Sequence, residues 1–264
     1  MEKLQAYFDT LLRDTPTRHH RYMFDRIDWE NRLVGLVGPR GVGKTTLMLQ
    51  YAKERLERNT TLFVNADDLY FSTRHLADLA DDFVKRGGRC LIIDEIHKYQ
   101  DWARELKLIY DYHAGLRVIF TGSSILDIHK GAADLSRRAL LYHMQGLSFR
   151  EYLQMFHDIQ LPVLTLDDIL QHRLELPRDF HPYAYFSDYL AQGYYPFSQE
   201  RQFDIRLQQV VTKTLETDIP QYAEMSVATS RKLKRLLTVI AQSVPFKPNM
   251  SHIATTIGIS RNNL

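Results

Sequence analysis

The stretch GLVGPRGVGKTTLML, residues 35–49, gathers glycines, a lysine and two threonines between apolar flanks. Glycine costs backbone entropy in a strand or a helix, so its accumulation predicts a tight turn or a loop that closes around a phosphate. Gly38, Gly43, Lys44 and Thr45 fit the pattern G-x-x-x-x-G-K-[ST], with a strand pattern before it and a helical pattern after it. The spacing therefore predicts a phosphate-binding loop whose N–H groups surround an anion at a helix N-terminus.

This loop predicts a definite division of roles. Lys44 is expected to reach the β- and γ-phosphates of a nucleotide, and the hydroxyl of Thr45 to complete a Mg²⁺ shell. We also expect the Lys44 side chain to be exposed and to pack little. The residues predicted to contact the nucleotide are Gly38, Pro39, Arg40, Gly41, Val42, Gly43, Lys44, Thr45 and Thr46.

Two acidic residues end a later apolar run, in CLIIDEIHK. A parallel strand would carry Asp94 to the edge of the sheet where the phosphate-binding loop also lies. Asp94 is then expected to hold Mg²⁺ through water, and Glu95 to polarise the water that attacks the γ-phosphate. The alternative is that both residues cap a helix.

A further apolar run ends in VIFTGSSILD, with hydroxyl side chains at its tip. Ser123 or Thr121 could hydrogen-bond the γ-phosphate or the attacking water. The alternative is that these hydroxyls cap a helix that begins near Ile125.

Four apolar runs alternate with helical patterns between Arg32 and about Phe149: RLVGLVG, TLFVN, RCLIIDE and LRVIFTG. Strands that are apolar on both faces and separated by helices require a parallel sheet covered on both sides. Leu4, Phe8, Leu11 and Leu12 share one helical stripe, which predicts an amphipathic helix at the start of the chain. After Phe149 the pattern is helical, broken by prolines. The sequence thus predicts an α/β sandwich followed by helices.

Composition limits the class of protein. The 264 residues carry 34 Lys+Arg against 32 Asp+Glu, a formal charge of +2, so overall charge does not favour nucleic acid or membrane. Cys90 is the only cysteine, which excludes an internal disulfide and a cysteine-rich zinc site. No stretch has the roughly 20 apolar residues of a membrane span. We expect a cytoplasmic protein.

Several motifs together resemble the bacterial and archaeal AAA-type ATPases of the AAA_14 type. They are GPRGVGKTTLMLQYA, LIIDEIHK, VIFTGSSI and LSRRALLYHMQGLSFREYL, and YLAQGYYP and TLETDI resemble the helical segment of that group. The resemblance implies a P-loop ATPase core, an α-helical lid and a winged helix, with ATP or ADP and Mg²⁺ as ligands.

Arg138 stands where the family has an arginine that reaches a γ-phosphate, from its own chain or a neighbouring one. It follows Arg137 where the family has glycine, and Gly146 replaces the usual proline before Leu147. An ordinary solvated charge cluster is the alternative for this pair of arginines. Arg18, Arg21 and Arg26, before the first strand, could border the base pocket or lie in a solvated loop, and receive no role.

The last segment, HIATTIGISRNNL, resembles the start of the family's winged helix. It predicts a helix around 251–257, a turn at Gly258 and a second helix from Ser260, as in a helix-turn-helix. The chain stops four residues later, so we expect a longer natural protein. Such an element binds DNA, a protein partner or the nucleotide.

These inferences predict a domain order of 1–30 (N-terminal helix and lead-in), 31–150 (ATPase core), 151–225 (helical lid) and 226–264 (start of a winged helix). We expect Mg²⁺-dependent ATP hydrolysis that drives a conformational switch, with Glu95, Arg138 and Ser123 as catalytic residues and Thr45 and Asp94 at the metal. Two alternatives stay open: a non-catalytic, ATP-dependent regulator that binds DNA or a partner, and a small-molecule kinase. A homo-oligomer and a DNA or protein client are the expected kinds of partner.

Overall fold

The four apolar runs form a parallel sheet, to which a fifth strand is added. In the computed structural model the strands are β1 (Leu33–Val37), β2 (Thr61–Asn65), β3 (Cys90–Asp94), β4 (Arg117–Gly122) and β5 (Leu140–His143), in the spatial order β2-β3-β4-β1-β5. All four pairings are parallel. The structure describes residues 1–122, 135, 137–173, 176, 180–219, 227–243 and 247–261. The predicted α/β sandwich is confirmed, although the prediction contains only four of the five strands.

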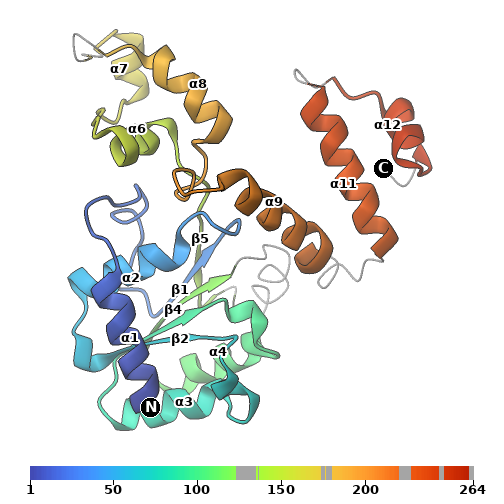
Figure 1. Cartoon of the computed structure of the whole chain (residues 1–264). Coiled ribbons are helices and arrows are strands. Elements are labelled where there is room, and N and C mark those ends of the chain that lie inside the picture. Colours follow the sequence, from blue (N-terminus) through green and yellow to red (C-terminus); the bar gives the residue numbers. More distant parts are fainter. Residues whose placement is uncertain are drawn as a thin grey trace. The chain divides into compact units, whose positions relative to one another are not determined.

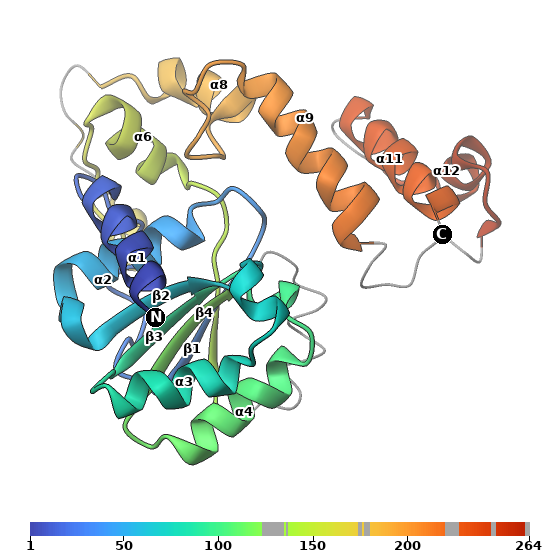
Figure 2. The ribbon, with the colours of Figure 1, turned by 60° about the horizontal axis from the view of Figure 1, so that its bottom comes forward.

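Helices cover both faces of the sheet because the strand residues alternate between two apolar cores. Leu91 and Ile93 of β3 belong to the core shared with α3 (Leu76–Lys85) and α4 (Trp102–Tyr112), whereas Ile92 belongs to the core shared with α2 (Lys44–Arg55). Figures 1 and 2 show α3 and α4 on one face and α1 (Glu2–Asp14) and α2 on the other. This arrangement places the carboxyl ends of all five strands at one edge.

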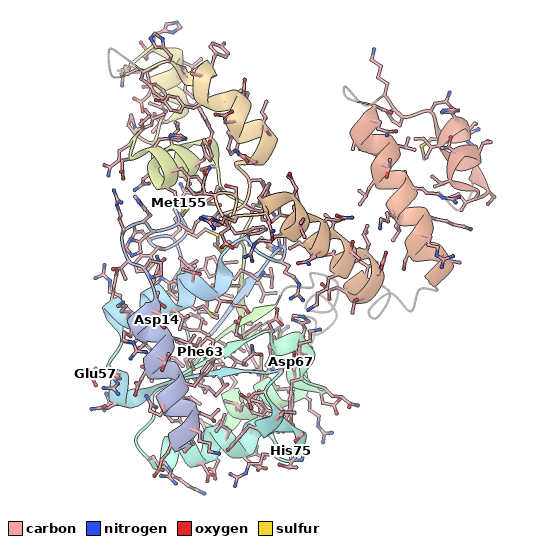
Figure 3. The ribbon with its side chains drawn as sticks, in the orientation of Figure 1. Asp14, Glu57, Phe63, Asp67, His75 and Met155 are labelled. Carbon is pink, nitrogen blue, oxygen red and sulfur yellow. The ribbon has the colours of Figure 1, made fainter. Side chains whose placement is uncertain are left out.

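The N-terminal helix α1 packs through the predicted apolar stripe. Leu4 and Phe8 are buried, and the ring of Phe8 stacks on Phe63 of β2 with centroids 6.3 Å apart. Figure 3 shows Phe63 beside α1. The stripe thus docks on the sheet rather than on a partner.

Short elements connect the strands and helices of the core. They are the 3₁₀ turns η1 (Arg58–Thr60), η2 (Leu69–Ser72) and η3 (Ile96–Lys98). Beyond β5, helices α6 (Phe149–His157), α7 (Leu166–Leu170) and α8 (Pro182–Gln192) follow in the unit Met1–Arg201. Tyr152 of α6 and Tyr189 of α8 pack together with ring centroids 5.5 Å apart, around a small core that includes Leu147 and Leu153.

A second compact unit spans Gln202–Leu264. It contains α9 (Phe203–Lys213), the π-helical turn η4 (Thr214–Asp218), α11 (Val227–Gln242) and α12 (Met250–Ile257). Gly258, with φ +72°, ends α12, so the predicted helix and glycine turn are confirmed. Residues 262–264 of the second predicted helix lie outside the described residues, and the winged helix stays a prediction. Within the described ranges, no helix combines the length and apolar character of a membrane span.

Candidate functional site

The glycine-rich loop between β1 and α2 curls tightly because Gly38, Gly41 and Gly43 have φ values of 154°, 84° and 93°. A Cβ atom on Gly38 would lie 2.1 Å from the carbonyl oxygen of Met144, so the close approach of the segment after β5 requires glycine. The N-cap of α2 is Gly43, which has no side chain to cap the first turn. The N–H groups of this turn can therefore bind an anion, which the helix dipole would favour.

The Lys44 side chain lies inside this loop. It is only 7% exposed, and its Nζ donates hydrogen bonds to the carbonyl oxygens of Gly38 (2.9 Å) and Pro39 (2.7 Å). Burial lowers the pKa of Lys44 to about 8, while the charges of Asp94 and Glu95 act in the opposite direction. The expectation of an exposed, loosely packed lysine is wrong, because the loop wraps around the ammonium group.

The Asp94 carboxylate joins three elements at the strand edge. Its Oδ2 accepts a hydrogen bond from Thr45 Oγ1 of α2 at 2.7 Å, and its Oδ1 accepts one from Thr121 Oγ1 of β4. Burial raises the pKa of Asp94, and the two hydroxyl donors oppose that rise. The predicted meeting of Thr45 and Asp94 is therefore present in the structure.

Glu95 turns back toward the glycine-rich loop. Its φ of 50° lies in the left-handed region, which is uncommon for a residue with a side chain. The backbone N–H of Glu95 donates to Thr121 Oγ1 at 3.0 Å, and its Oε1 lies 3.2 Å from Nη1 of Arg40. Arg40, in the loop, and Glu95, after β3, thus form an ion pair beside Lys44.

These groups line a cavity of about 540 Å³. The lining from the loop and the strand edge consists of Arg40, Gly41, Gly43, Lys44, Thr45, Thr46, Asp94, Glu95 and Thr121. Apolar side chains also line it, from Pro16, Met155, Pro196 and Phe197, and the ring of Phe197 lies against Gly41. Figure 3 shows Met155 on α6. Charged, polar and apolar side chains thus line one cavity, which suits a ligand that has both phosphate groups and an aromatic ring.

Not every predicted residue lies in this cavity. Val42 does not line it: its side chain is buried in the core, and its carbonyl group accepts a hydrogen bond from Arg21. Ser123 lies outside the described residues, whereas Thr121, the other predicted hydroxyl, contacts Asp94. Within the described part of the chain no three His, Cys, Asp or Glu side chains gather as a metal cluster.

Arg138 lies away from the cavity. Its Nε and Nη2 donate to Oδ1 and Oδ2 of Asp111 at 3.0 and 3.2 Å. Asp111 is near the C-terminal end of α4, and Arg138 comes just before β5, so the pair lies at the amino ends of the parallel strands. Arg138 therefore lies at the edge of the sheet opposite to the glycine-rich loop, and the predicted phosphate contact stays a prediction.

One buried ion pair was not predicted from the sequence. Arg21 Nε donates to Glu151 Oε1 at 2.7 Å, and the two side chains are 5% and 4% exposed. The sequence does mark Glu151 as a helix-capping residue: Ser148 and Glu151 fit the S-x-x-E capping box that opens α6. Nothing local connects Glu151 with an arginine 130 residues earlier.

Comparison with family models matches two parts of the chain. Residues 30–153 match the family described as AAA domain, AAA_14. Residues 183–264 match a domain of unknown function, DUF8612. The first match contains the glycine-rich loop and the acidic pair.

Individual known proteins resemble the chain more weakly than the family models do. The uncharacterized protein MJ1637 of Methanocaldococcus jannaschii is 27% identical over 255 residues, which cover 89% of this chain, and the chain spans about half, 54%, of that protein. The Walker-type ATPase PABY2304 of Pyrococcus abyssi has a TM-score of 0.46 at 14% identity, over 86% of this chain and 82% of that one. AMPPCP-bound DnaA from Aquifex aeolicus has a TM-score of 0.34 at 12% identity, over 99% and 85%.

Proposed function

We propose that this chain, whose residues 30–153 match the AAA domain family AAA_14, is a P-loop ATPase that binds ATP with Mg²⁺ and hydrolyses it. The observation that carries the proposal is the convergence of Thr45, Asp94, Thr121 and Glu95 beside the lysine of the glycine-rich loop. Phosphate-binding, cation-binding and water-activating groups then share one cavity.

The oxygen groups at the strand edge fit Mg²⁺. Thr45 supplies a hydroxyl and Asp94 a carboxylate, and Mg²⁺ is usually bound by one or two such oxygen groups together with substrate phosphates and water. When bound, the ion would neutralise charge on the phosphate oxygens.

The loop and its lysine bind the triphosphate. The amides of the first turn of α2 face the phosphates, and Lys44 supplies a positive charge from inside the loop. Contact with a phosphate would favour the charged form of Lys44, which burial disfavours in the free protein.

Glu95 would orient the attacking water and accept its proton at Oε1 or Oε2. The water oxygen forms a bond to the γ-phosphorus as the bond to the bridging oxygen breaks, which releases ADP and phosphate. In the structure Oε1 of Glu95 is paired with Arg40, so catalysis requires the other carboxylate oxygen or a shift of Arg40 toward the phosphates.

The apolar side chains of the cavity would contact the nucleoside. Met155 can pack against the face of a base, whereas Phe197 lies against Gly41 of the loop. Gln50 fixes the lead-in segment by donating to the carbonyl oxygens of Pro16 (2.8 Å) and His19 (2.9 Å). Arg18 and His19 also line this cavity.

Purified protein tests the proposal directly. Glu95→Gln should still bind ATP in calorimetry but should hydrolyse it about 10- to 1000-fold more slowly, because the carboxylate that orients water is lost. Glu57→Gln, at an exposed residue that does not line the cavity and that Figure 3 labels away from Met155, is the matched control and should hydrolyse ATP at the parent rate.

Each other outcome has a definite meaning. Parent protein that binds ATP without turnover would support the non-catalytic regulator, and a phosphorylated small molecule would support a kinase. We further propose that turnover moves the helical part, and that α12 contacts DNA or a protein client. Assembly into a homo-oligomer would be measured by light scattering, with and without ATP.

A further inference from the structure

We propose that Arg21 positions the phosphate-binding loop and links it to α6. The inference rests on the proposed nucleotide binding and adds a residue from outside the loop and the acidic pair. Arg21 is buried, and its guanidinium group contacts four acceptors that belong to three separate segments of the chain.

The contacts of Arg21 use the planar shape of its head group. Nη1 donates to the carbonyl oxygen of Val42 at 2.5 Å, and Nη2 donates to those of Gln145 (2.8 Å) and Gly146 (2.9 Å). Nε donates to Glu151. A lysine has one nitrogen and no fork, so it cannot reach all four acceptors in this geometry.

The contact with Val42 sets the direction of one amide. Val42 C=O and Gly43 N–H belong to the same planar trans peptide unit, in which the two groups point in opposite directions. Because Arg21 holds the carbonyl oxygen inside the protein, the N–H of Gly43 is aimed the other way. Gly43 lines the cavity, so Arg21 aims this donor at the phosphate position.

The ion pair with Glu151 connects Arg21 to helix α6. Oε1 of Glu151 also accepts from the backbone N–H of Tyr22 at 2.9 Å, and Oε2 accepts from the N–H and the hydroxyl of Ser148, both at 2.9 Å. Glu151 is thus both the counter-ion of Arg21 and the acidic partner in the capping box of α6. Since α6 carries Met155 into the cavity, the loop and the wall of the cavity share one network.

The first measurement is the affinity for a non-hydrolysable ATP analogue by calorimetry. Arg21→Lys keeps the positive charge beside Glu151 but loses contacts to backbone carbonyls, so affinity should fall about 10- to 100-fold, the loss expected for one charge-assisted hydrogen bond. Arg58→Lys is the control, because Arg58 forms an exposed pair with Asp9 far from the cavity, and it should bind as the parent does.

A double-mutant cycle separates positioning from a general loss of structure. Ser148→Ala weakens the cap of α6 without touching the nucleotide, and should lower affinity about 3- to 10-fold in the parent. The same change should have little further effect in Arg21→Lys, because the link is already broken. Additive losses, or parent-like affinity in Arg21→Lys, would overturn the inference.

Three further outcomes are interpretable. If Arg21→Lys does not fold by circular dichroism, Ser148→Ala alone decides, and unchanged affinity in that variant contradicts the link. Weaker binding in Ser148→Ala supports it. If the parent protein binds no nucleotide, the proposed function fails, and this inference fails with it. If the parent binds nucleotide and the Arg21→Lys variant binds it equally well, only the inference is contradicted.

Discussion

The hydroxyl group of Thr45 donates a hydrogen bond to Oδ2 of Asp94 over 2.7 Å, so the start of α2 and the end of β3 meet at one point. The proton of the hydroxyl is directed at the carboxylate, which leaves the lone pairs of Thr45 Oγ1 for a cation. The second carboxylate oxygen is held by Thr121. In the proposed function, this arrangement would present the hydroxyl and carboxylate oxygens to Mg²⁺.

Asp94→Asn should remove most of the Mg²⁺-dependent gain in ATP affinity, about 10- to 100-fold, because a charged acceptor is replaced by a neutral one. The measurement is calorimetry with and without Mg²⁺. Asp67→Asn, at an exposed residue after β2 that Figure 3 labels, is the control and should bind as the parent does. An unchanged Mg²⁺ effect in Asp94→Asn would place the metal elsewhere.

Gly38→Ala should destabilise the protein and abolish nucleotide binding, because the new Cβ would collide with the carbonyl oxygen of Met144. Gly87→Ala is the matched control, since Gly87 also has a positive φ, +88°, but has open space around it. The control should lose only about 1–2 kcal/mol, the cost of a left-handed backbone for a residue with a side chain. Urea unfolding compares the two, and equal losses would show that the close approach to Met144 is unimportant.

The lowered pKa of Glu151 predicts that the folded protein loses stability in acid. Burial alone would raise its pKa, but the hydrogen bond and charge of Arg21, with the N–H groups of Ser148 and Tyr22, outweigh burial and hold the pKa below 4.5. A lowered folded-state pKa stabilises the protein above the unfolded value near 4.5, and this contribution disappears as pH falls through the folded value.

Thermal unfolding from pH 7 down to pH 3 checks this expectation. The parent should be more stable than Glu151→Gln at pH 7, and the difference should shrink below about pH 4.5. A difference that stays constant over this range would show that the pKa of Glu151 is the same in the folded and the unfolded protein.

Arg138→Ala should lower ATP turnover without weakening ATP binding if Arg138 acts on the site of a neighbouring subunit. Its pairing with Asp111, at the amino ends of the strands, favours this arrangement over action on its own chain. Mixing Arg138→Ala with Glu95→Gln should restore hydrolysis, because each variant lacks a different part of a shared site. Mixed oligomers that show no recovery would contradict action between subunits.

The glycine-rich loop and the four strands with buried runs could be predicted because their signals are local. Gly43, Lys44 and Thr45 are adjacent in sequence, and a strand buried on both faces is apolar throughout. The same logic brought Asp94 to the loop, because parallel strands end at one edge.

The remaining features depend on tertiary packing. β5 was not predicted because its four residues, Leu140–His143, are exposed or half-buried and lack a buried apolar run. Lys44 is buried because the loop wraps around it, and the spacing of residues in the motif does not reveal this wrapping. Arg21 and Glu151 are 130 residues apart, so only the folded chain brings them together.

The strand order has a consequence for synthesis. β1 pairs with β4 on one edge and with β5 on the other, so residues 33–37 have no strand partner until residues 117–122 have been made. At about 5 to 20 residues per second, roughly 4 to 16 s pass between β1 and β4 leaving the ribosome's active centre. During that time a fully apolar strand with two unpaired edges is present in the nascent chain. The glycine-rich loop is thus completed late, because Gly38 packs against Met144, which is made after β4.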